Sequence, residues 1–216
     1  MAVTQNPIIG MSRKSVGNVS FRTWRGLNII QAKPLRVKDT YSDAKQAQRN
    51  CMVLIVYVYR RIKAAVLDGL INFVLPRDQY TWFLSLNLVG ATDKSAAPSV
   101  SLIPASMVIS SGIIGVTSMS PTIPSPGDAF LEIGWAPTPA PANGAASDLI
   151  FVVIWNETLN EWYAEGHASG IIRSDALDHI VLPFSWDTGH NGHVWTGFIR
   201  ADFAEVSDNS YNSFAV

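Results

Sequence analysis

Apolar residues recur at spacings of three and four along the segment from Asp43 to about Leu70, which predicts an amphipathic helix. Ser42 is placed to cap the start of this helix, and Asp43 puts an acid in its first turn. The β-branched residues between Val53 and Val58 favour a strand instead, but the length of the segment and its Ala-, Gln- and Arg-rich flanks favour the helix. The stripe consists of Ala44, Ala47, Cys51, Leu54, Ile55, Val58, Ile62, Ala65 and Val66.

A second apolar stretch, from Tyr80 to Val89, follows Pro76 and is consistent with either a helix or the first strand of the next region. The composition of the chain then changes. Eight of the 12 prolines lie between Lys94 and Asp148, where the only charges are Asp128 and Glu132. Because proline is tolerated at strand edges and turns but not in helix interiors, this region is predicted to consist of loops and short strands.

Five strands are predicted in the second half of the chain, and the sequence Asn156 to Asn160 is typical of a hairpin loop between two of them. Short strands at roughly 10-residue spacing, with turn residues between them, indicate an antiparallel β-sandwich, Ig-like or jelly-roll-like. The predicted strands are Ala129 to Trp135, Leu149 to Asn156, Glu161 to His167, His179 to Pro183 and His193 to Phe203.

The N-terminal region alternates small, polar and apolar residues, with Gly10, Gly17 and Gly26 as interruptions, which predicts an extended arm or short hairpins. We therefore expect an α+β fold that is mainly β, with one long helix between the arm and the sandwich. The predicted domains are a basic arm over residues 1–41, a helical segment over 42–90 and a β-sandwich over 91–216.

The net charge of -1 hides a strong asymmetry. Residues 1–63 contain 12 of the 16 Lys and Arg residues and only the acids Asp39 and Asp43, which gives +10, and the remainder carries 4 basic and 15 acidic residues, which gives -11. A basic arm of this kind can bind nucleic acid or lie on the acidic body of a neighbouring copy. We favour the neighbouring copy, because the negative charge of the body nearly equals the positive charge of the basic segment.

Charged residues make up only 15% of the chain, against roughly 25% in typical proteins. A surface poor in charge promotes association. We therefore predict that residues 95–147, which carry two charges, are largely buried between chains. The single cysteine, Cys51, excludes a disulfide framework within the chain and any cysteine-based zinc or iron–sulfur site.

Signatures of common enzyme chemistry are missing from the sequence: it has no GxGxxG, GxxxxGK, GxSxG or HExxH motif. Asp187, His190 and His193 are weak candidates for a metal site, since two histidines three residues apart could share an ion with a carboxylate, but a polar loop explains them better. Glu161, Glu165 and His167 would lie on one face of a strand and could resemble an acid/base cluster. The polar, solvent-exposed face of an ordinary sheet explains this alternation equally well. We expect no catalytic residues, no metal and no cofactor.

No signal peptide or membrane-spanning segment is expected. The first 12 residues lack a basic start and a long apolar run. The uncharged stretch from Ser95 to Gly127 is interrupted by five prolines, and the apolar run from Cys51 to Tyr59 is nine residues long, well below the ~20 that a spanning helix needs. These features predict synthesis in the cytoplasm without membrane insertion.

Several short motifs stand out along the chain: Val16-Gly17-Asn18-Val19, Trp24-Arg25-Gly26, Lys33-Pro34 and Ala47-Gln48-Arg49, followed by a predicted helix and a β-rich tail. Together these motifs resemble a domain family of unknown function that occurs in Bacteroidota and their phages. The chain has Lys14-Ser15 where the family tends to have Gly-Lys. The resemblance implies a frequent occurrence among phage genes, and it supplies no catalytic residues.

The combined expectation is a non-enzymatic structural protein of a phage virion, in the capsid or the tail, that assembles in multiple copies and with other virion proteins. The alternatives are a nucleic-acid-binding protein that uses the basic arm and, less favoured, a cell-surface binding module. No small-molecule substrate is expected. The predicted partner-binding residues are Arg13, Lys14, Arg22, Trp24, Arg25, Lys33, Arg36 and Lys38.

Overall fold

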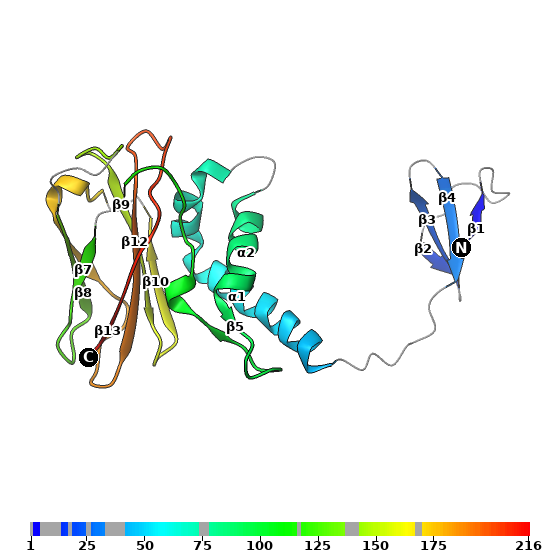
Figure 1. Cartoon of the computed structure of the whole chain (residues 1–216), viewed down its shortest axis with the longest axis horizontal. Helices are drawn as coiled ribbons and strands as arrows, with labels where there is room; N and C mark the ends of the chain where they lie inside the picture. Colours follow the sequence, from blue (N-terminus) through cyan, green and yellow to red (C-terminus); the bar gives the residue numbers. More distant parts are fainter. Residues whose placement is uncertain are drawn as a thin grey trace. The chain divides into compact units, whose positions relative to one another are not determined.

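The chain divides into two compact units, Met1–Tyr41 and Ser42–Val216, in a computed structural model (Figure 1). The structure describes residues 2–4, 14–16, 19–24, 27–32, 42–73, 78–115, 118–136, 143–166 and 170–216. The boundary between the units falls where the sequence changes from the predicted arm to the predicted helix. The helical segment and the β-rich region belong to the same unit.

The first unit is a small antiparallel sheet with the strand order β1-β4-β3-β2. The register pairs Ser20 with Gln31 and Phe21 with Ile30. Ile29 is buried, with 3% of its surface exposed. The N-terminal region therefore contains hairpins, as the alternation of its residues predicts. Its strands are β1 (Ala2–Thr4), β2 (Lys14–Val16), β3 (Val19–Trp24) and β4 (Leu27–Ala32).

Two helices begin the second unit: α1 (Asp43–Gly69) and α2 (Gln79–Gly90). Ile62 has non-helical angles (φ -108°, ψ 16°), so α1 is interrupted by a kink at this residue. Ser42 precedes α1 in an extended conformation, but its side chain makes no capping hydrogen bond, contrary to the sequence-based expectation. Asp78 caps α2 by accepting a hydrogen bond from the backbone N–H of Thr81 at 2.9 Å. The stretch from Tyr80 to Val89 is therefore helical.

The central sheet of this unit has the order β10-β9-β12-β13 and is antiparallel throughout. A second antiparallel sheet has the order β11-β8-β7, and β5 (Thr92–Asp93) pairs with β6 (Ser101–Leu102). The strands are β7 (Met119–Thr122), β8 (Phe130–Trp135), β9 (Leu149–Asn156), β10 (Glu161–Glu165), β11 (Leu177–Val181), β12 (Asn191–Ile199) and β13 (Ser210–Ala215).

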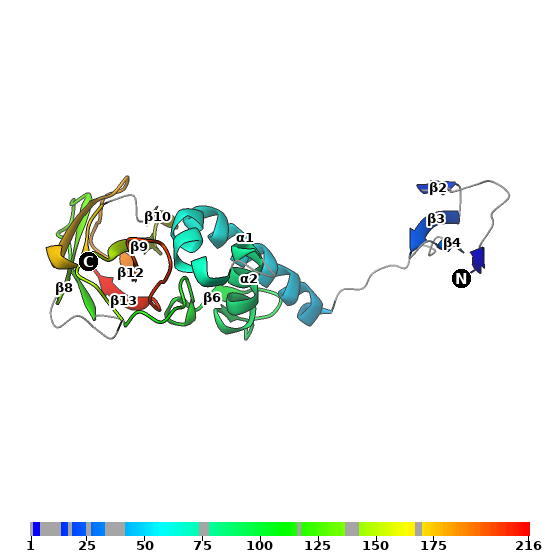
Figure 2. The same ribbon diagram turned by 90° about the horizontal axis from the view of Figure 1, so that it is seen from above.

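The second unit has three layers, with the central sheet between the helices and the three-stranded sheet (Figures 1 and 2). Successive residues of β9 face opposite sides of their sheet. Phe151 and Val153 belong to a buried cluster that includes Ile55 and Val58 of α1. Val152 and Ile154 belong to a second buried cluster, shared with the three-stranded sheet. Burial on both faces explains the continuous apolar run of β9.

Packing also explains why α1 is a helix despite its β-branched residues. Cys51, Ile55, Val58 and Ile62 are each at most 1% exposed. Their helical spacing places one continuous apolar stripe against the central sheet, with contacts to β10, β9 and β12. Tertiary packing thus outweighs the local β preference of the segment.

Two asparagines hold the segment from Met107 to Ser110. The buried Asn87 side chain donates to the carbonyl of Val108 at 2.8 Å and accepts from its N–H at 2.8 Å. From the other side, Asn209 accepts from the N–H of Ile109 at 3.0 Å and donates to the carbonyl of Met107 at 3.2 Å. These bonds join α2 to the segment that leads into β13.

The expected class, α+β and mainly β, is confirmed. Leu149 to Asn156 is a strand as predicted, and the loop from Asn156 to Asn160 connects the antiparallel strands β9 and β10. Other bounds differ: β11 begins at Leu177, and β12 runs from Asn191 to Ile199, so Phe203 lies in a turn. Strands β7 and β13 were not predicted, and His167, expected at the end of a strand, lies outside the described residues.

Candidate interaction surfaces

The outward face of α1 is lined by apolar and basic side chains, which we call the α1 ridge. Val53 is 69% exposed and Met52 is 41% exposed, although both are large hydrophobic residues. Two shallow hollows of about 430 and 360 Å³ share Val53 and Tyr57 in their walls. The ridge lies opposite the buried stripe of the same helix and consists of Lys45, Arg49, Met52, Val53, Val56, Arg60 and Lys63.

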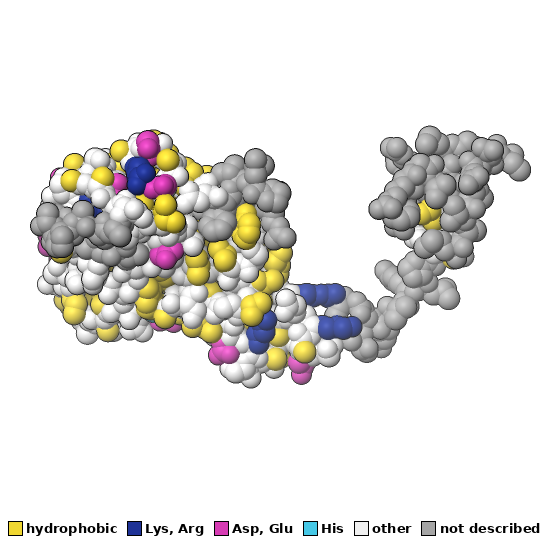
Figure 3. Space-filling model, turned by 45° about the horizontal axis from the view of Figure 1, so that its top comes forward, with side chains coloured by type: hydrophobic (Ala, Val, Ile, Leu, Met, Phe, Trp, Pro, Cys, Tyr) yellow, Lys and Arg dark blue, Asp and Glu magenta, His cyan; other side chains and the backbone are white. Residues whose placement is uncertain are grey.

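Positive charge dominates this helix. Five of the residues of α1 are Lys or Arg, and its only acids are Asp43 and Asp68. The guanidinium of Arg61 lies 5.2 Å from the centre of the Tyr57 ring, within the range of a cation–π contact. Figure 3 shows dark blue side chains where α1 begins, with yellow, white and a few magenta side chains around them. The α1 ridge is therefore apolar at its centre and basic around it.

The outer face of the three-stranded sheet is a second exposed apolar surface, which we call the β8 face. Val181 is 68% exposed and Leu177 is 50% exposed. Between them His179 lies opposite Glu132 in the register, with 3.2 Å from its Nδ1 to a carboxylate oxygen, and its ring stacks on Phe130 at 4.6 Å. No Lys or Arg occurs in β7, β8 or β11.

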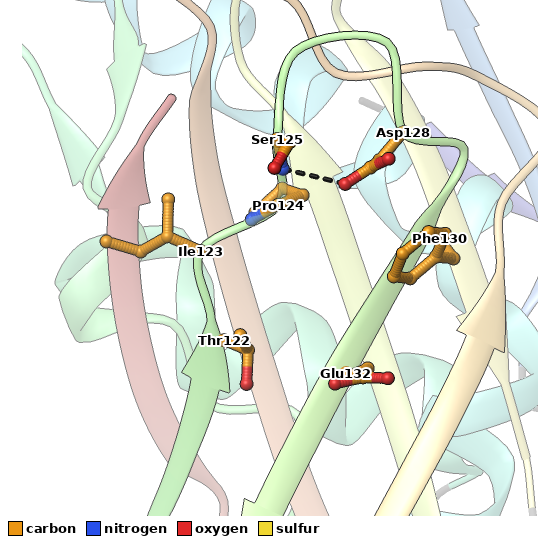
Figure 4. Close-up of a pocket in the computed structure, with 7 residues that line it drawn as sticks. All are labelled: Thr122, Ile123, Pro124, Ser125, Asp128, Phe130 and Glu132. Atoms are coloured by element: carbon orange, nitrogen blue, oxygen red, sulfur yellow. Dashed lines mark hydrogen bonds between the residues drawn. The ribbon is translucent and has the colours of Figure 1, made fainter.

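A hollow of about 230 Å³ lies at one end of the β8 face, where the chain turns between β7 and β8 (Figure 4). The carboxylate of Asp128 accepts a hydrogen bond from the N–H of Ser125 at 2.7 Å, which fixes this loop. Glu132 supplies a second carboxylate, and Ile123 is 61% exposed. The lining is therefore apolar and acidic: Thr122, Ile123, Pro124, Ser125, Asp128, Phe130 and Glu132.

The weak metal candidates Asp187, His190 and His193 serve separate contacts. Nδ1 of His190 accepts from the backbone N–H of Asp187 at 3.0 Å, so this nitrogen is occupied. Nδ1 of His193 lies 2.9 Å from the hydroxyl of Tyr211, and its Nε2 lies 3.3 Å from a Glu157 oxygen. Among the described residues no group of three His, Cys, Asp or Glu side chains is placed to hold a metal ion.

A stack of aromatic rings covers the helix side of the central sheet. Trp162 and Trp155 are stacked at 4.9 Å between ring centres, and His193 stacks on Trp155 at 5.0 Å. Trp195 is fully buried and donates its indole N–H to the carbonyl of Pro104 at 3.1 Å. These tryptophans anchor the core.

Sequence inspection missed a buried ion pair between Arg173 and Asp148. Both side chains are fully buried, the guanidinium lies 3.7 Å from the centre of the Phe198 ring, and Asp148 also accepts from the N–H of Ala145. Burial lowers the pKa of Arg173, and the Asp148 carboxylate opposes this shift. The two residues are 25 positions apart, and no local pattern pairs them.

Of the eight predicted partner-binding residues, three lie in described strands of the first unit. Lys14 pairs with Phe21, Arg22 with Ile29, and Trp24 with Leu27. The other five lie outside the described residues: Arg13, Arg25, Lys33, Arg36 and Lys38. The structure thus brings Lys14, Arg22 and Trp24 into one antiparallel sheet.

Comparison with known proteins places the chain in a family. Residues 10–213 match the family of unknown function DUF6266, so the chain belongs to this family. None of the curated proteins compared with it matches the sequence. Within the part of the chain that the structure describes, neither helix is both long enough and apolar enough to cross a membrane.

Proposed function

We propose that this member of the DUF6266 family is a non-enzymatic structural protein that assembles in multiple copies, as a component of a phage particle. The observation that carries the proposal is the exposure of Val53 and Val181, both more than two-thirds exposed, on the two outer layers of the second unit. Exposed apolar faces on a surface poor in charge are typical of protein contacts.

Three further features support this proposal. The two sheets of the second unit share a buried cluster, which supports its interpretation as a β-sandwich with an added helical layer. The described polar clusters pair groups that stabilise loops and strands, such as His190 with the N–H of Asp187. The sequence motifs resemble a family that we expect to be frequent among phage genes, and this resemblance favours a role in a phage particle.

The test is the association state of the full chain. We expect the purified protein to form species larger than a monomer in sedimentation velocity as its concentration rises from about 1 μM to about 1 mM. A protein that remains monomeric over this range would contradict the proposal. Detection of the chain in purified particles by mass spectrometry would then distinguish a virion component from another assembly.

Nucleic-acid binding is a second candidate function, favoured by the concentration of 12 of the 16 basic residues within residues 1–63. If these residues neutralise phosphates, affinity falls with salt, with a log–log slope of about -0.9 per contact on duplex DNA. Filter binding across salt concentrations, on the wild type and on a variant with Arg22, Arg25, Arg36 and Lys38 changed to Glu, measures this slope. Tight, salt-dependent binding by the wild type alone, with equal assembly of both proteins, would favour this function.

A further inference from the structure

The α1 ridge and the β8 face point away from the central sheet in opposite directions. The ridge is the back of a helix whose buried residues Ile55 and Val58 share a cluster with residues of β9 and β12. The β8 face is the back of a sheet whose Leu131 and Ile133 are buried toward the other side of β9. The two surfaces therefore form opposite ends of one three-layered unit (Figure 2).

The two surfaces also match in chemistry. Each has an apolar centre, with Val53 and Met52 on the ridge and Val181 and Leu177 on the β8 face. The ridge surrounds its centre with lysines and arginines. The β8 face offers the carboxylate of Glu132, with that of Asp128 in the adjoining hollow, and its strands contain neither Lys nor Arg. A basic apolar surface paired with an acidic apolar surface is the complementarity that favours specific association.

Pairing either surface with itself is less favourable. Two ridges would bring the cations Lys45, Arg49, Arg60 and Lys63 of one copy against the same cations of the next, and like charges in an interface are repulsive. Two β8 faces would bring carboxylates together, and the strands of these faces contain no Lys or Arg to neutralise them. Charge thus selects contact between unlike surfaces.

We propose that the α1 ridge of one copy docks on the β8 face of the next copy, in a head-to-tail contact. This inference rests on the proposed assembly in multiple copies and specifies its geometry. A contact between different surfaces of identical chains does not end with a dimer: it produces a closed ring or an open filament. The occupant of each surface is therefore a second copy of this chain.

The test uses one charged substitution on each surface of the full chain. Val53→Asp places a carboxylate in the centre of the ridge, and Val181→Asp does so on the β8 face. Each variant alone should lose association, with an apparent dissociation constant raised at least about tenfold. An equimolar mixture should form 1:1 dimers and nothing larger, because one intact ridge and one intact β8 face remain per pair.

Val89→Asp is the matched control, since Val89 is 76% exposed and lies on α2, outside both surfaces. It should assemble as the wild type does. Circular dichroism melting verifies that each variant is folded. If Val53→Asp or Val181→Asp does not fold, Met52→Asp on the ridge or Leu177→Asp on the β8 face takes its place.

The outcomes separate the two proposals. A wild-type chain that is monomeric at all concentrations contradicts both. If the wild type assembles but only one of the two variants is impaired, or if the mixture yields no heterodimer, the head-to-tail contact is wrong while assembly stands. Unimpaired assembly of Val53→Asp would overturn the head-to-tail contact, because the ridge would then take no part in assembly.

Discussion

Nη2 of Arg173 lies 3.3 Å from Oδ2 of Asp148, and neither side chain has any surface exposed to solvent. The backbone joins the same two residues, since the N–H of Arg173 donates to the carbonyl of Asp148 at 2.8 Å. Trp135 adds a third connection through its indole N–H, which donates to the carbonyl of Arg173 at 2.7 Å. The pair therefore connects the segment before β9 to the segment before β11.

Removal of one partner should be far more harmful than removal of both. Asp148→Ala leaves a buried guanidinium without its carboxylate, and we expect a loss of about 3–5 kcal/mol in the free energy of unfolding. Combining it with Arg173→Met removes both charges and should recover part of that loss. Urea denaturation measures both values. A loss below about 1 kcal/mol in Asp148→Ala would show that the pair contributes little.

Gly112 marks a close backbone approach that no side chain can enter. A Cβ at this position would overlap the carbonyl oxygen of Val206, which accepts a hydrogen bond from the N–H of Ile114. Gly112→Ala should therefore lower stability by about 2 kcal/mol or more. Gly90→Ala is the control, because nothing lies within 4 Å of its Cβ position. Equal melting temperatures of the two variants would contradict this account.

The cap of α2 should respond to acid. Hydrogen bonds from Thr81 lower the pKa of Asp78 below its ordinary value of 3.8, so the folded state favours the carboxylate. The resulting stabilisation is complete above pH 3.8 and is lost as pH falls through the lowered pKa. The melting temperature of the wild type should exceed that of Asp78→Ala at pH 7, and this difference should shrink toward pH 2.

Asp78→Ser serves as the comparison for that experiment. Serine can cap the helix without titrating, so the difference between Asp78→Ser and Asp78→Ala should stay constant with pH. A wild-type advantage over Asp78→Ala that is unchanged between pH 7 and pH 2 would exclude the ionised cap as its source.

Deletion of residues 1–41 should leave the second unit folded, because its two buried clusters include none of the residues of the first unit that the structure describes. We expect a cooperative thermal transition and a near-ultraviolet circular dichroism spectrum dominated by the buried tryptophans. If residues 1–41 also bind neighbouring copies, as their charge predicts, the chain that lacks them should associate more weakly. Loss of the cooperative transition would show that the units depend on each other.

The parts of the fold that sequence predicts well are those with one dominant signal. Leu149 to Asn156 is eight residues of nearly continuous apolar character, and it is a strand buried on both faces. Strand β13 (Ser210–Ala215) was missed because four of its six residues are Ser, Asn or Ala, and its place comes from pairing with β12. Strand β7 was missed because it contains Pro121, although proline is tolerated in edge strands such as this one.

The candidate surfaces illustrate a different limit. Val53 and Ile55 are both β-branched residues of one helix, yet one is 69% exposed and the other is fully buried. Helical periodicity assigns Val53 and Ile55 to different faces of a helix. Because the same residues also favour a strand, the sequence does not show which of them is exposed. Leu177 and Val181 are ordinary strand residues in the sequence, and only the packing of the sheets reveals that they face outward.

Asn209 ties the order of synthesis to the completion of the fold. Its hydrogen bonds to Met107 and Ile109 join residues that a ribosome makes about 100 positions apart. Until Asn209 emerges, the 107–110 segment lacks one of its two asparagine partners, so the growing chain carries an incomplete core while about 100 further residues are made. If chaperones bind the nascent chain, we therefore expect them to protect the 107–110 segment, because its partner Asn209 is translated late.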